Sequence, residues 1–137
     1  MIRWQRWVLV CAGLHCLVWG VFIILLPAAS AAVYGFAHVP AEIHLWQGSG
    51  LFILLLGIGF SIASRDPMKH WLMVLVGLLA KVLGASGMVF SVLRGQVSPD
   101  VLWLLPVNDL IWCWPLFLIV RQAIQREALA SSPLESA

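Results

Sequence analysis

The chain has 137 residues, of which 62% are hydrophobic and 10% are charged, and its formal net charge is +2. A water-soluble domain of this length cannot bury so much apolar surface, and so small a net charge does not favour nucleic acid as a partner. The composition therefore predicts a single integral membrane domain.

Four apolar stretches are long enough to cross a bilayer as helices, which takes about 20 residues each. We expect the four spans at residues 7–26, 47–64, 71–93 and 101–120. The turn between the second and third spans is short, which favours an antiparallel pair. The predicted fold class is all-α, an up-down-up-down four-helix transmembrane bundle over residues 1–126. A polar, disordered tail is expected at 127–137.

The segment after the first span resembles a signal-peptidase site, because it contains the string Ala28-Ala29-Ser30-Ala31-Ala32. The apolar region before it is longer than a usual signal sequence, and three further spans follow. We therefore expect the first helix to be retained. Residues 27–46 are mildly hydrophobic, which favours a segment lying at the membrane interface, and Pro40 is well placed to open the second helix.

Basic residues near the span ends predict the orientation, because cytoplasmic loops carry an excess of Lys and Arg. One side of the predicted bundle has a single basic residue, Arg94. The other side has Arg3, Arg6, Arg65, Lys69, Arg121 and Arg126. We therefore expect both termini in the cytoplasm.

Small residues in the second and third spans predict close helix contacts, since lipid offers no hydrophobic drive for helix association. In the third span they recur on one helical stripe, which predicts a packing face. The residues concerned are Gly48, Gly50, Gly57, Gly59 and Ser61 in the second span and Gly77, Ala80, Gly84 and Gly87 in the third.

Two ionisable residues lie inside apolar spans, where charge is costly and normally faces a partner in the bundle interior. Lys81 should lie about 15 Å from one boundary and Asp109 about 12 Å from the other, at about 1.5 Å per residue of helix. These depths nearly coincide, and His15 falls close to the same level. Asn108 precedes Asp109, and Pro106 should kink or partly unwind the fourth span beside them. The sequence thus allows a mid-membrane polar centre of Lys81, Asp109, Asn108 and His15.

Three interpretations of this centre stay open. It could be a functional site, either a proton relay or a pocket for a polar headgroup or a quinone. It could be a structural ion pair that sets helix register. Alternatively, Asp109 could cap a helix that restarts after Pro106, nearer the outer surface.

A second polar group is expected at the outer face, made of His38, Glu42, His44 and Gln47. Its spacing matches no established metal-ligand signature, so interfacial hydrogen bonding is favoured over metal binding. No second histidine matches the depth of His15, so no haem is expected. The cysteines Cys11, Cys16 and Cys113 lie in apolar runs without a CxxC spacing, which predicts small core residues.

The chain carries no phosphate-binding glycine loop and no GxSxG or HExxH motif. The stretches Gly57-Ile58-Gly59-Phe60, Arg65-Asp66-Pro67 and Val107-Asn108-Asp109-Leu110-Ile111-Trp112 resemble small four-helix bacterial membrane proteins of the DoxX-like type. The resemblance covers most of residues 45 to 120. It implies a multi-pass protein of the bacterial inner membrane, and some members are implied to be subunits of quinone-linked redox systems.

We therefore expect a non-catalytic accessory or scaffold subunit, serving a quinone-linked redox or stress-response system, with quinone or lipid as the ligand of its polar centre. One alternative is a small proton-coupled carrier that acts as a dimer. Another is a membrane-embedded enzyme acting on a lipid or quinone, which would need an open groove beside His15 and Asp109. Membrane lipid is an expected partner, and a homodimer or a larger membrane complex is left open.

Overall fold

The computed structural model describes residues 3–36 and 41–131, and every regular element in these two ranges is helical. The elements in chain order are α1 (Arg3–Leu25), α2 (Pro27–Val33), α3 (Ile43–Ala63), α4 (Trp71–Leu93), η1 (Pro99–Trp103), η2 (Pro106–Leu110) and α5 (Ile111–Ser131). The predicted all-α class is confirmed.

Four helical segments are long and apolar enough to cross a membrane: Arg3–Leu25, Ile43–Ala63, Trp71–Leu93 and Pro99–Ser131. Their outer faces carry large apolar side chains such as Leu14, Phe52 and Leu83, which are more than half exposed. In water such a surface would aggregate, whereas lipid solvates it. The chain is a multi-pass membrane helix bundle.

The helices differ from the predicted spans mainly at their ends. The first begins at Arg3 and the second at Ile43, because helical hydrogen bonding continues beyond the most apolar residues. Helix α5 continues to Ser131, so the part of the predicted tail from 127 to 131 is helical. There Trp71 Nε1 donates a hydrogen bond to Glu127 Oε1 at 2.7 Å, which joins α4 to α5. Residues 132–137, and the predicted helix opener Pro40, lie outside the described residues.

Helices α1 and α3 pack along most of their length through two pairs of glycines, Gly13 with Gly57 and Gly20 with Gly50. A Cβ atom added at Gly20 would lie 2.7 Å from the backbone nitrogen of Leu54 and 2.8 Å from the carbonyl oxygen of Gly50. Each pair is seven residues from the next, so the contacts recur on one face of each helix. The glycines of the second span therefore pack mainly against the first helix.

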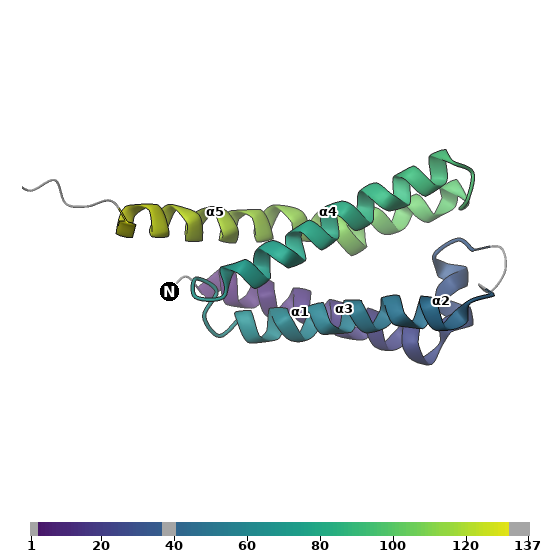
Figure 1. Cartoon of the computed structure of the whole chain (residues 1–137), viewed down its shortest axis with the longest axis horizontal. Helices are drawn as coiled ribbons and strands as arrows, with labels where there is room; N and C mark the ends of the chain where they lie inside the picture. Colours follow the sequence, from purple (N-terminus) through teal and green to yellow (C-terminus); the bar gives the residue numbers. More distant parts are fainter. Residues whose placement is uncertain (1–2, 37–40, 132–137) are drawn as a thin grey trace, which may run out of the picture.

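Helices α4 and α5 form a second pair, which is inclined against the first (Figure 1). The two pairs lie closest at the end that holds the start of α1, where Gly77 of α4 packs on the ring of Phe60. A buried core there joins all four long helices through Leu9, Phe60, Val74 and Leu116.

The pairs diverge toward the end that holds α2 (Figure 1). A second apolar cluster lies at that end and contains Ile23, Tyr34, Val101 and Leu104. Pro27 occupies the first turn of α2, where a missing backbone N–H costs nothing. Trp46 Nε1 of α3 donates to the Ser30 hydroxyl at 2.9 Å and so ties α2 to the bundle. The space between the two cores contains the candidate site.

Candidate functional site

The fourth spanning segment is interrupted where the sequence predicts it. Residues 99–103 form a 3₁₀ helix, and Pro106–Leu110 form a turn of π-helix before α5 begins. The Ile111 N–H reaches the carbonyl of Pro106, five residues back, so the turn is wider than an α-helical turn. Single π turns of this kind occur frequently at functional sites. Here the turn presents the adjacent side chains of Asn108 and Asp109 to the bundle interior.

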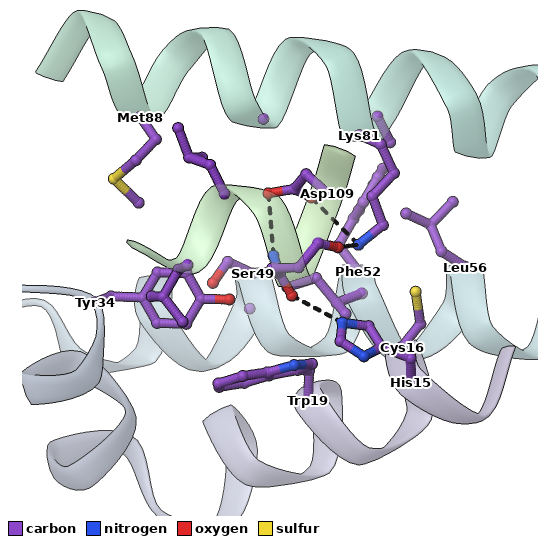
Figure 2. A pocket seen from close by; sticks show the side chains of 17 residues that line it. His15, Cys16, Trp19, Tyr34, Ser49, Phe52, Leu56, Lys81, Met88 and Asp109 are labelled. Atoms are coloured by element: carbon purple, nitrogen blue, oxygen red, sulfur yellow. Dashed lines mark hydrogen bonds and ion pairs between the residues drawn. The ribbon is translucent and has the colours of Figure 1, made fainter. Parts of the chain in front are cut away.

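The structure brings together all four residues of the predicted polar centre. Lys81 Nζ lies 3.3 Å from Asp109 Oδ1 and donates to the backbone carbonyl of Asn108 at 2.7 Å. The Asn108 amide donates to Asp109 Oδ2 at 3.2 Å. Its oxygen lies 2.9 Å from His15 Nε2, which requires that ring nitrogen to carry a proton. Figure 2 shows Lys81 reaching down from α4 to Asp109 and His15 approaching from α1.

Both charges of the polar centre are buried, with Lys81 exposed by 7% and Asp109 by 9%. The contacts disfavour the cap interpretation, because Asp109 is buried inside the π turn and its carboxylate faces Lys81 and Asn108. The geometry is compatible with both remaining interpretations, the structural ion pair and the functional site. Which one the contacts favour depends on what the centre faces.

The polar centre forms one wall of a cavity of about 610 Å³ between the two helix pairs. Its other lining side chains are predominantly apolar, among them Trp19, Phe52, Ile53, Leu56 and Met88 (Figure 2). Ligand sites for small molecules are typically apolar cavities of this size with a few convergent polar groups. The Lys81–Asp109 pair is therefore not sealed inside a packed core.

Two glycines on facing helices keep this cavity open. Gly48 of α3 and Gly84 of α4 both line it, and a Cβ atom added at either would meet nothing within 4 Å. Phe52 and both glycines are the exposed residues of the cavity lining, and they lie on α3 and α4. The cavity therefore opens sideways between α3 and α4, toward the lipid. The predicted packing face of the third span is correct at Gly77 but wrong at Gly84 and Gly87, which pack against nothing.

Tyr34, which follows α2, closes the cavity toward the end of the bundle that holds α2. Its ring makes edge contacts with Trp19 and Trp46 at centroid distances of 5.7 and 5.1 Å. Figure 2 shows its hydroxyl pointing into the cavity. Burial raises the pKa of Tyr34 to about 12, and the negative charge of Asp109 contributes in the same direction. The hydroxyl therefore stays a neutral hydrogen-bond donor at physiological pH.

The ionisation of Tyr34 can be measured alone, since the chain has a single tyrosine. We expect phenolate absorbance in the near ultraviolet to appear with a midpoint about 12 in the folded protein, against the ordinary 10.0 in the unfolded chain. The unfolded state releases its proton first, so stability should fall between these two pH values by on the order of 2–3 kcal/mol. A folded-state midpoint near the ordinary value would place Tyr34 outside the cavity.

The predicted outer-face cluster does not form as one group in the described part of the chain. Glu42 and His44 approach each other at 3.6 Å but are both largely exposed. Gln47 turns away and donates to the carbonyl of Ile24 at 2.9 Å, which helps to hold α3 against α1. His38 lies outside the described residues. An exposed pair of this kind contributes little to stability.

Several residues of the site were not predictable from the pattern of polar residues in the sequence. Trp19, Tyr34 and Ser49 line the cavity, and Gly48 and Gly84 open it. The single tyrosine in an interfacial segment was an available signal, but nothing in the spacing showed which way it faces. Of the cysteines, Cys16 is a buried core residue that reaches the cavity, whereas Cys11 is exposed on the outer surface, contrary to prediction.

The chain was compared with protein families, curated proteins and solved structures. No protein-family model, no curated protein and no solved structure matches the chain.

Proposed function

We propose that this chain is a membrane-embedded accessory subunit that binds a lipid-soluble molecule, a quinone or a lipid, in the cavity beside Lys81 and Asp109. One observation supports this best. The cavity opens to the lipid between α3 and α4, and a buried polar centre forms its inner wall. A ligand could enter from the bilayer, place its polar head at the centre and leave its apolar part among the aromatic and aliphatic side chains.

The shape of the cavity favours this function over a pure scaffold and over a carrier. A dry, sealed ion pair would support a pure scaffold, yet the pair borders an open cavity. A carrier for ions or polar solutes needs a polar pathway across the membrane, whereas most of this lining is apolar. A membrane-embedded enzyme on a lipid or quinone is the second candidate, because the groove that it requires is present beside His15 and Asp109.

The proposal includes an arrangement in the bacterial inner membrane, with helices that alternate in direction and both termini in the cytoplasm. Six basic residues on one side against Arg94 on the other support this orientation. The resemblance to DoxX-like proteins over residues 45 to 120 is the ground for placing the chain beside a quinone-linked redox complex. A reporter active only in the cytoplasm, fused after residue 137, should be active; an inactive fusion would reverse the orientation.

Filling the cavity should abolish ligand binding without loss of fold. We expect Gly84→Leu to occupy the cavity, because its side chain would enter open space, while the thermal stability stays unchanged. Gly87→Leu is the matched control, since Gly87 lies on the same helix and is equally free of contacts but does not line the cavity.

The measurement is the content of co-purified quinone and lipid in the wild type and the two variants, by chromatography and mass spectrometry. A compound present in the wild type and in Gly87→Leu but missing from Gly84→Leu supports the proposal, and its identity separates quinone from lipid. Equal content of every compound in all three proteins, together with equal quenching of tryptophan fluorescence by an added decyl benzoquinone, would reject it.

A further inference from the structure

The polar wall of the cavity carries no net charge, because its one cation and one anion already compensate each other. The Lys81 ammonium has three N–H donors. Among the described residues it has two partners, Asp109 Oδ1 at 3.3 Å and the Asn108 carbonyl at 2.7 Å. One donor is therefore left for a molecule in the cavity, while the positive charge itself is neutralised by the carboxylate beside it.

A second donor available to a ligand is the Tyr34 hydroxyl, which points into the cavity (Figure 2). The Asn108 side chain is a hydrogen-bond partner of the Tyr34 hydroxyl group. Ser49 also lines the cavity, but its hydroxyl proton is donated to the Trp46 carbonyl at 2.6 Å. The cavity thus offers a ligand hydrogen-bond donors from Lys81 and Tyr34, beside the fixed negative charge of Asp109.

We infer that the cavity selects an uncharged headgroup with a carbonyl-type oxygen and rejects anionic heads such as carboxylates and phosphates. The inference rests on the proposed function. An uncharged acceptor oxygen can bond to a donor of the cavity, and it brings no charge to mid-membrane depth. An anionic head would lie beside Asp109, and the Lys81 charge that could offset the repulsion is already paired with that carboxylate. Placing like charges together in a buried site is strongly unfavourable.

A matched pair of probes tests this selectivity: dibromostearate and its methyl ester, which share one brominated chain and differ only in head charge. Bromine quenches tryptophan fluorescence on contact, and Trp19 lines the cavity. Quenching in the wild type minus quenching in Gly84→Leu reports on the cavity alone. At a pH where the free acid is ionised, we expect the ester to bind at least about tenfold more tightly than the acid.

Two variants assign the selectivity to named residues. Tyr34→Phe removes one donor without changing the ring, and we expect ester affinity to fall about 3- to 10-fold, the usual effect of losing one neutral hydrogen bond. Asp109→Asn removes the anion and leaves the Lys81 charge free, so the preference should reverse in favour of the acid.

The outcomes distinguish a failure of the headgroup inference from a failure of the proposed function. Equal binding of acid and ester by the wild type, or tighter binding of the acid, overturns the headgroup inference and leaves the proposed function standing. Unchanged ester affinity in Tyr34→Phe overturns it as well, even if Asp109→Asn fails to fold. If neither probe gives a signal that Gly84→Leu removes, the proposed function itself fails.

Discussion

Replacing Lys81 with methionine is expected to destabilise the bundle by about 3–5 kcal/mol, because a buried carboxylate would lose its charge partner. Asp109→Leu should have a comparable effect, since it leaves the buried ammonium unpaired. The double variant should recover most of the loss, because no buried charge is then left without a partner. Thermal or denaturant unfolding in one detergent gives the three differences.

Lys69→Met is the control for the Lys81 substitution. Lys69 is the only other lysine of the chain, and it lies exposed in the turn between α3 and α4. Its replacement should change stability little, as is usual for surface positions. Strictly additive effects of Lys81→Met and Asp109→Leu would mean that the two side chains do not interact, and the polar centre described above would be wrong.

The cycle also separates a structural role of the pair from a functional one. If the double variant regains stability and still binds the brominated ester as the wild type does, the pair serves helix packing alone. If it regains stability and loses the ester, the pair acts directly on the ligand. The second result is expected, because Lys81 lines the cavity and has a donor left for a ligand.

Gly57→Leu is expected to have the second large effect, separation of α1 from α3. A Cβ atom at Gly57 would lie 2.8 Å from the backbone nitrogen of Leu17 and 2.9 Å from the carbonyl oxygen of Gly13. Backbone atoms cannot move aside as a flexible side chain can, so the cost should reach or exceed the about 1–3 kcal/mol typical of overpacking. The measurement is the unfolding midpoint in detergent.

Gly48→Leu is the matched control, because Gly48 lies on the same helix and a Cβ atom there would meet nothing within 4 Å. It should keep the midpoint of the wild type and, as a lining residue, reduce ligand binding. Similar destabilisation by both substitutions would show that the effect is a general cost of leucine in α3 and not a loss of the α1–α3 contact.

The sequence by itself determined the all-helical fold class, the number of apolar segments and the depth of the polar centre within them. In hydrocarbon every backbone group must be bonded within its own segment, so apolar runs of sufficient length become helices. The missing N–H of Pro106 predicted the interruption beside Asn108 and Asp109. A constant rise per residue then placed Lys81, Asp109 and His15 at one depth, where Asn108 links His15 to the Lys81–Asp109 pair.

Only the tertiary structure decided which small residues pack and which leave space. Gly57 lies against the backbone of α1, whereas Gly48 and Gly84 face an open cavity, although all three lie in equally apolar helices. The sequence likewise did not predict that the two helix pairs diverge, or that Tyr34, which follows α2, lines the cavity between them. The physical reason is that lipid and bundle interior are both apolar, so hydrophobicity does not mark which helix face turns inward, and side-chain packing decides it.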